Sequence, residues 1–383
     1  MSQYYTIDQL HISGSGRWFG NANVVTVILI LTKKNSPAIP DPDEKTQFYI
    51  WRKSLQDMGK TDVEKLTAQV LLGRRNPTSE LYTMCDYSMS EIKTILGMNI
   101  SINSLFHNIE WLPSIASNLC PVTKYLIVTR GERRGWDKMF YPTAGHKIEE
   151  KYIRKVLKSS RQLSGLYALP DSDAFCCSDS IEILEKGNCV GALQWIRSFE
   201  HEQNGVGKPL PQVLKRANMY WYEMKDTNTA DFVTGMNPDR RLFVSKFDEP
   251  TFVNQRLIAF KCNDTADNKE IIHALLNSVI GLFYIEAIGF GRGLGTLDIN
   301  ATNIGNMFML DPELLNDEDK RDIIAKFKVV CSRDILAVSD ELKKEDRIEF
   351  DHAVLKAYHI DCYYDEICDA LYSMQHIRHT AAE

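Results

Sequence analysis

The stretch Asn23-Val-Val-Thr-Val-Ile-Leu-Ile-Leu31 is the strongest fold signal in this chain of 383 residues. It is almost wholly apolar and rich in β-branched residues, which is typical of a strand covered on both faces. A single strand cannot cover both of its own faces, and the residues that follow do not obviously supply a sheet. The stretch therefore predicts that residues 24–31 complete a structure larger than this segment.

The residues after this strand favour helices. A polar, proline-rich stretch over 37–44 predicts a linker. Two capping-box sequences follow, Thr61-Asp-Val-Glu64 and Ser88-Met-Ser-Glu91, each ahead of apolar residues at helical spacing. We therefore expect a small helical segment over residues 45–110.

From Trp111 onward the pattern changes to a mixture of strands and helices. Strands are predicted at Tyr125–Thr129, Leu242–Ser245 and Arg256–Phe260, with loops containing glycine and proline between them. Helical periodicity returns over residues 269–288 and again after Asp311. The pattern indicates an α+β protein.

Charge is distributed unevenly along the sequence. The whole chain has 45 Lys+Arg and 51 Asp+Glu, a net charge of −6, which by itself argues against a nucleic-acid-binding protein. Residues 124–161, however, carry a net charge of +7, and residues 311–383 carry −8. The acidity therefore belongs to the C-terminal fifth, and a DNA-facing surface is permitted elsewhere.

Composition excludes several other classes of protein. With 44% apolar and 25% charged residues, the chain is expected to fold rather than to be disordered. No run of 18 apolar residues and no signal-peptide pattern occurs, so we expect a cytoplasmic protein with no membrane association. The nine cysteines form no C-x-x-C pair, so we expect reduced thiols and no metal site.

The segment Arg130-Gly-Glu-Arg133-Arg134-Gly-Trp136-Asp-Lys138 directly follows a predicted strand. Arginine binds phosphate oxygens or guanine in a bidentate manner, and tryptophan stacks on bases. The alternative is a solvated loop with a partly buried tryptophan. The candidate DNA contacts here are Arg130, Arg133, Arg134, Trp136 and Lys138.

A second basic cluster follows, mostly at spacings of three or four residues: Lys151, Arg154, Lys155, Lys158 and Arg161. On a helix this spacing would gather the side chains toward one side, where they suit a phosphate backbone, although an ordinary exposed basic face is an equal alternative. We take Lys155, Lys158 and Arg161 as candidate phosphate contacts.

The glycine-rich sequence Gly289-Phe-Gly-Arg292-Gly-Leu-Gly295 invites comparison with phosphate-binding loops. Such loops need a strand before the glycines and a helix after them, and here the predicted order is reversed. A glycine-rich turn leaving a helix is the simpler interpretation. The alternative places Arg292 against a phosphate. No G-x-S-x-G or H-E-x-x-H sequence occurs, and we name no catalytic residue.

Five segments together, in their order along the chain, resemble the C-terminal half of adenine-specific DNA methyltransferases of Type II restriction–modification systems. They are residues 16–33, 129–161, 207–256, 274–278 with the following glycine-rich turn, and 346–355. The first is similar to a late strand of the methyltransferase domain, and the second to the entry into the target-recognition domain. The family's Asn/Asp-Pro-Pro-Tyr/Phe motif is missing, because none of the 13 prolines are adjacent, and the motif that binds S-adenosylmethionine is missing too.

The resemblance implies a division of the chain into four parts. They are the terminal strand region of a methyltransferase-like domain at 1–36, a helical segment at 37–110, a mixed α/β target-recognition domain at 111–310, and an acidic C-terminal helical region at 311–383.

The resemblance also implies a function in double-stranded DNA recognition. The chain would be a recognition subunit or fragment of an adenine-specific methyltransferase, and a separate catalytic chain would bind S-adenosylmethionine. That partner would dock on the first segment, through Trp18, Phe19, Val25, Val27 and Leu29. The alternative is a non-catalytic remnant, or a protein-interaction module that uses the recognition fold.

Overall fold

The computed structural model describes residues 3–19, 25–54, 57–71, 80–291 and 295–380. Contacts between Cα atoms divide the chain into two compact units. Unit 1 comprises Met1–Lys124, Asn237–Phe243 and Asn268–Glu383. Unit 2 comprises Tyr125–Met236 and Val244–Asp267. Helices and sheets occur in both units, so the α+β prediction is confirmed.

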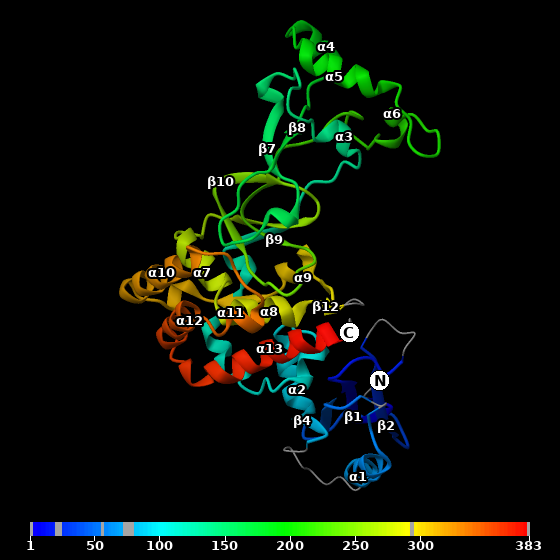
Figure 1. Ribbon diagram of the computed structural model, residues 1–383, viewed down its shortest axis with the longest axis vertical. Coiled ribbons are helices and arrows are strands. Elements are labelled where there is room, and N and C mark those ends of the chain that lie inside the picture. The colour runs from blue at the N-terminus through cyan, green and yellow to red at the C-terminus, as the bar shows by residue number, and fades with distance from the viewer. Residues whose placement is uncertain (1–2, 20–24, 55–56, 72–79, 292–294, 381–383) are drawn as a thin grey trace. The chain divides into compact units, whose positions relative to one another are not determined.

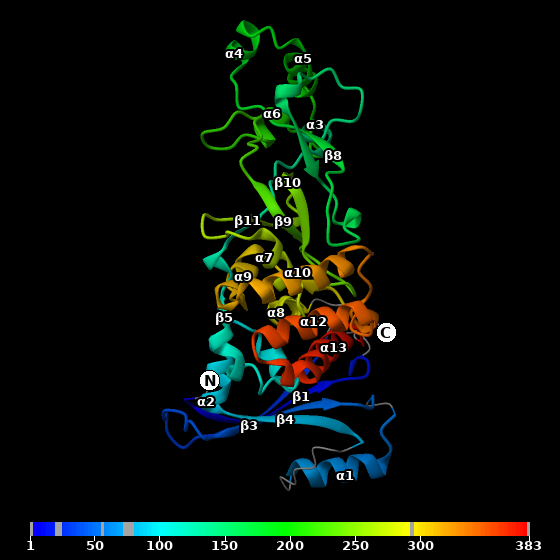
Figure 2. The ribbon, with the colours of Figure 1, turned by 90° about the vertical axis from the view of Figure 1, so that its left-hand side faces the viewer.

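Unit 1 contains a four-stranded sheet with the order β2-β1-β3-β4. Its strands are β1 (Tyr5–Ser13), β2 (Val27–Lys33), β3 (Lys45–Trp51) and β4 (Tyr82–Ser88). β1 is antiparallel to β2 and parallel to β3, and β3 is antiparallel to β4. In Figure 2, α1 (Lys60–Leu71) lies on the opposite side of these strands from α12 (Glu345–Ala357) and α13 (Tyr364–Thr380).

This sheet corrects two expectations. The predicted apolar strand exists as β2, but the expectation that the chain supplies no sheet for it is wrong, because β1 pairs with it from Tyr5–Lys33 to Ile12–Val27. The helical prediction over 37–110 is also wrong in part, since β3 and β4 lie within it. β3 contains Phe48-Tyr-Ile-Trp51, whose aromatic and β-branched side chains favour a strand once a neighbouring strand is present.

The helices of unit 1 agree better with the sequence. Ser88 and Glu91 form the predicted capping box at the start of α2 (Met89–Gly97). The C-terminal region is helical as expected. The remaining helices of unit 1 are α7 (Lys269–Leu276), α8 (Val279–Ile288), α9 (Ala301–Gly305), α10 (Asp317–Cys331) and α11 (Val338–Glu341). Within the described residues no single helix has the length and composition to cross a membrane; α7 and α8 meet that test only as a pair, bent by 60°.

A buried carboxylate joins α12 to α8. The Asp351 carboxylate of α12 accepts from the Val279 N–H at the start of α8 (2.8 Å) and from Arg347 Nε (2.7 Å). Two small sheets complete unit 1. They pair β5 (Leu119–Pro121) with β14 (Phe308–Leu310), and β12 (Phe290–Gly291) with β13 (Leu297–Asp298).

Unit 2 is built on a six-stranded sheet with the order β6-β11-β9-β10-β7-β8. The strands are β6 (Leu126–Arg130), β7 (Ile153–Leu157), β8 (Ser172–Phe175), β9 (Thr229–Gly235), β10 (Ser245–Val253) and β11 (Leu257–Cys262). β6 and β11 confirm two predicted strands. The predicted strand at 242–245 overlaps β10 only at Ser245.

The helix considered for the basic cluster over residues 151–161 does not form. Residues 153–157 form β7, which pairs with β8 along its length and with β10 at its end. Val156 and Leu157 are fully buried in the sheet, and this burial outweighs the helical spacing of the basic residues. Because side chains alternate along a strand, Arg154 and Lys155 point to opposite faces of the sheet.

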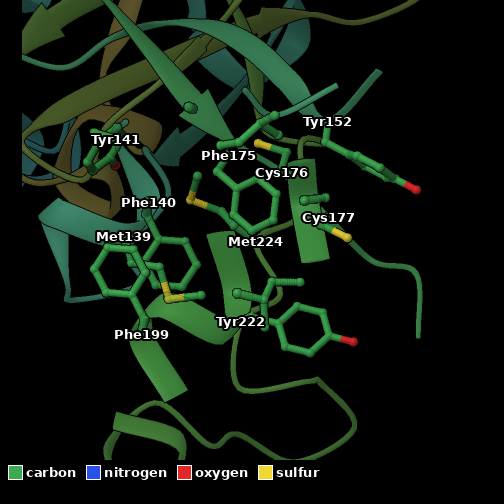
Figure 3. Close-up of a cluster of buried hydrophobic side chains, with 14 of the residues drawn as sticks. Met139, Phe140, Tyr141, Tyr152, Phe175, Cys176, Cys177, Phe199, Tyr222 and Met224 are labelled. Atoms are coloured by element: carbon green, nitrogen blue, oxygen red, sulfur yellow. The ribbon is translucent and has the colours of Figure 1, made fainter. Parts of the chain in front are cut away.

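Beyond the sheet, unit 2 has a core of its own, shown in Figure 3. Met139 and Phe140, Phe175, Phe199 and Met224 come together there from separate parts of the chain. The helices around this core are α3 (Asp137–Phe140), α4 (Ile181–Lys186), α5 (Val190–Glu200) and α6 (Leu210–Val213), which are labelled in Figure 1. α3 overlaps the end of the predicted DNA-contacting segment, Arg130–Lys138, and so connects that segment to this core.

Candidate nucleic-acid interface

The loop after β6 is fixed at its start by a close backbone approach. A Cβ at Gly131 would lie 2.2 Å from the Asn254 carbonyl oxygen, so only glycine fits there. The Glu132 N–H donates to the Val253 carbonyl at 2.9 Å. The loop therefore crosses the end of β10, and its position is set by the sheet.

The far end of the same loop is anchored in the core. Met139 and Phe140 are fully buried. Trp136 packs against the same core, and its Nε1 donates to Glu202 at 3.2 Å. The indole is therefore held by the protein, as the alternative interpretation of a partly buried tryptophan expected.

The predicted cations of this loop take two different positions. Arg130, Arg133 and Lys138 are exposed. Arg130 Nε donates to the Gln255 carbonyl at 2.7 Å, which directs its side chain across the end of β11. The Arg133 carbonyl accepts from Arg216, whereas no hydrogen bond of the Arg133 guanidinium is found among the described residues.

Arg134, in contrast, is only 5% exposed. Its Nη2 donates to the carbonyls of Leu214 at 3.1 Å and Trp221 at 2.7 Å, and its guanidinium lies 5.2 Å from the Phe140 ring centroid. Burial lowers the pKa of Arg134 to about 10. Its contacts tie the loop to residues 214–221, so this arginine has a structural role and stays out of the interface we describe.

The second basic segment lies beside the first. Lys158 Nζ is 4.6 Å from the Tyr141 ring centroid and 3.5 Å from the Asp137 carboxylate. Tyr141 in turn accepts from Asn254 Nδ2 at 2.6 Å, and burial raises the pKa of its phenol to about 12. The structure thus brings the end of β7 and the 130–141 loop together, which the sequence alone did not show.

The other cations of this segment face solvent. The Lys155 side chain is 73% exposed, and its ammonium lies 2.6 Å from Asp173. Arg161 is exposed in the turn after β7. Arg154 of the same basic cluster donates from Nε to the Asp226 carboxylate at 2.6 Å.

A hollow of about 620 Å³ opens between these segments. It is lined by Tyr141, Pro142, Thr143, Ala144, Lys155, Lys158, Pro170, Asp171, Ser172 and Asp173. Two candidate lysines therefore share one concave surface with hydroxyl and carboxylate groups. Sequence reasoning missed Ser172, which the pairing of β7 with β8 brings beside the lysines. It also missed Tyr141 and Thr143, which line the same hollow from a separate segment.

Charge is divided between the units. Unit 2 has 19 Lys+Arg and 18 Asp+Glu, a net charge of +1, whereas unit 1 has 26 and 33, a net charge of −7. Carboxylates already neutralise Lys155 and Lys158 in part. The net positive charge of unit 2 thus comes from residues 130–161, which have 10 Lys+Arg and 4 Asp+Glu. Exposed cations such as Lys186, Lys215 and Lys261 also occur elsewhere in the unit.

The remaining predicted sites lie in unit 1. Arg292 is outside the described residues. Trp18 packs against a cluster that includes Tyr49 and Trp51, and Val25 is half-buried. Phe19, Val27 and Leu29 are 52%, 41% and 45% exposed. Among the described residues, no group of three or more His, Cys, Asp or Glu side chains is placed to hold a metal ion.

Comparison with known proteins gives a match at the level of structure. Neither a protein-family profile nor a curated protein matches the sequence. Among solved structures, the type IIG restriction endonuclease BpuSI is similar to this chain with a TM-score of 0.53 and 11% sequence identity. The match covers 99% of this chain and 44% of that chain. The chain therefore has a fold similar to part of a restriction enzyme and spans less than half of that enzyme's length.

Proposed function

We propose that this chain is the sequence-specific DNA-recognition part of a restriction–modification or related phage-defence system. The carrying observation is the fold similarity to a type IIG restriction endonuclease over 99% of the chain. The order of the methyltransferase-like segments and the exposed cations of unit 2 support it. The substrate would be double-stranded DNA.

In this proposal the DNA surface is formed by cations at the ends of β6 and β7. They are the exposed Arg130, Arg133, Lys138, Lys155 and Arg161, together with the half-buried Lys158. The lysines would contact phosphates, which position a protein on DNA without reading its sequence. Arg133 has an exposed guanidinium on a rigidly anchored loop and is suited to a bidentate contact with guanine. Trp136 would support this loop from its partly buried position.

The carboxylates in the hollow add a second kind of contact. Asp171 accepts from the backbone N–H groups of Lys158 and Ser159 at 2.8 and 3.0 Å, and is therefore fixed in place. A carboxylate next to a phosphate is repelled, but a carboxylate that faces the cytosine N4 amino group accepts a hydrogen bond from it. Asp173 beside Lys155 has the same capacity. The two aspartates therefore favour hydrogen bonds to base edges over non-specific binding to phosphates.

Methyl transfer would belong to a separate catalytic chain. Adenine-specific methyltransferases hold the target amino group with an Asn/Asp-Pro-Pro-Tyr/Phe motif, and this sequence has no adjacent prolines. We assign no cofactor to this chain and place S-adenosylmethionine in the partner. Extrusion of the adenine would also occur in the partner's pocket.

The proposal is tested by selecting bound duplexes from a randomised DNA library with the full chain, alone and with its catalytic partner. A single enriched sequence is expected. Arg133→Ala should relax the preference at one position, whereas Lys155→Ala should weaken binding to all sequences about equally. Absence of an enriched sequence in both arms would contradict the proposal and would favour the protein-interaction alternative.

A further inference from the structure

β2 differs from its neighbours in the exposure of its apolar side chains. Val27 and Leu29 point to one face of the sheet and are 41% and 45% exposed. Ile28 and Ile30 point to the other face and are 47% and 38% exposed. Four consecutive large apolar residues of one strand are thus open to solvent on both faces.

The neighbouring strands are covered on these same faces. On the face of Val27 and Leu29, the adjacent residues Leu10 and Ile12 of β1 are 6% and 5% exposed. The next strand, β3, continues the pattern with Phe48, which is 1% exposed.

The opposite face shows the same contrast. His11 of β1, beside Ile28, is 4% exposed, and Tyr49 and Trp51 of β3 are equally buried. Their rings stack, with centroids of His11 and Tyr49 4.7 Å apart. The layers that cover the sheet therefore end at β1 on both faces.

β2 also lies at the edge of the sheet. In the order β2-β1-β3-β4, its only strand neighbour among the described residues is β1. Natural proteins protect edge strands with charges, prolines or covering elements, because open edges pair with other chains. The sequence Val27-Ile-Leu-Ile-Leu-Thr-Lys33 has none of these before its last residue.

We infer that β2 pairs with the edge strand of a second protein's sheet, and that helices of that protein cover both faces of β2. The partner is a protein whose sheet has helices on both sides, because this α/β architecture buries apolar strands on both faces. We identify the partner as the catalytic methyltransferase chain, and this identification rests on the proposed function. The pairing and covering of β2 do not depend on it. The chain covers 44% of the matched restriction enzyme, so that enzyme has further parts beyond the shared fold.

Other kinds of partner would cover only part of the exposed surface of β2. A helix laid on the sheet would cover one face and leave the backbone edge unpaired. A second copy of this chain could pair its β2 with this β2. In the second copy, however, the layers that cover the sheet also end at β1, so neither β2 strand would be covered. Two uncovered apolar strands would then lie side by side in solvent, which disfavours the self-dimer.

The test uses the tagged full chain purified from the cells that make it, after treatment with an amine-reactive cross-linker. Lys33 is exposed at the end of β2 and provides the reporter amine. We expect a cross-link from Lys33 to a polypeptide that carries the S-adenosylmethionine and Asn/Asp-Pro-Pro-Tyr/Phe motifs. Ile28→Lys and Leu29→Lys, one on each face, should each lower recovery of that polypeptide at least tenfold.

The matched control is Val329→Lys on α10, where an equally exposed valine (55%) lies away from the sheet in sequence and should leave recovery unchanged. Duplex binding by each variant chain shows that the variants are folded and tests the DNA proposal separately. Recovery of the wild-type chain alone, or cross-linked only to itself, would overturn the inference. So would sensitivity to only one of the two substitutions, because that result means a partner on one face.

Discussion

Arg133 and Arg134 show how far the residue type alone determines a role. Both were predicted to contact DNA, since both lie in the same Arg/Gly-rich loop. One is exposed, and the other is buried against the Leu214 and Trp221 carbonyls. The difference comes from residues about 80 positions away, so no local pattern could have separated the two side chains.

Substituting Arg133 and Arg134 separately distinguishes an effect on DNA binding from an effect on the stability of the fold. Arg134→Ala should lower the free energy of unfolding by about 2–4 kcal/mol, because buried carbonyls lose a charged donor. Arg133→Ala should change it by less than about 0.5 kcal/mol and should instead weaken DNA binding. Urea unfolding and fluorescence anisotropy with duplex DNA measure the two effects. A destabilising effect of Arg133→Ala equal to that of Arg134→Ala would contradict the assignment.

His11 makes unit 1 sensitive to acid. Its Nδ1 accepts from Trp51 Nε1 at 3.2 Å, and burial lowers its pKa from 6.5 to about 4. Between these pH values the unfolded chain binds a proton at His11 and the folded chain does not, so stability falls as pH falls from 6.5 to 4. His11→Gln should reduce this fall by about 3 kcal/mol, measured by urea unfolding at several pH values. An unchanged slope in this variant would refute the role of His11.

At the scale of elements, local sequence patterns predicted the helices and strands that a single segment determines. The capping box at Ser88, the strands β6 and β11 and the C-terminal helices were predicted correctly. The strands β3 and β7 were missed, because each forms through partners distant in sequence. The grouping of β7 with the 130–141 loop depends on those same pairings, so the candidate site could be predicted only as two separate segments.

Gly131 tests whether this grouping positions the loop. Gly131→Ala places a Cβ 2.2 Å from the Asn254 carbonyl oxygen and should displace the loop from the end of β10. We expect at least tenfold weaker DNA binding and a lower melting temperature. Gly205→Ala is the matched control in unit 2, since a Cβ there meets nothing within 4 Å. Equal effects of the two substitutions would show that the close approach at Gly131 is unimportant.

At the scale of the whole molecule, the net charge of −6 conceals a division between a near-neutral unit 2 and a unit 1 with a charge of −7. Non-specific adhesion to DNA is therefore expected to be weak, and binding should depend on a few cations near residues 130–161. The fold similarity extends over 99% of the chain and over 44% of a restriction enzyme. In our proposal the chain is a recognition part that acts with another catalytic component.

The most direct test of DNA recognition is the salt dependence of duplex binding by the full chain and a triple variant. Each lost phosphate contact lowers the slope of log K against log salt concentration by about 0.9. Lys138→Ala/Lys155→Ala/Arg161→Ala should therefore bind more weakly and with a slope smaller by about 2–3. Lys328→Ala/Lys343→Ala, exposed cations of unit 1, should match the wild type. Equal affinity and slope for the wild type and the triple variant would contradict DNA recognition by unit 2.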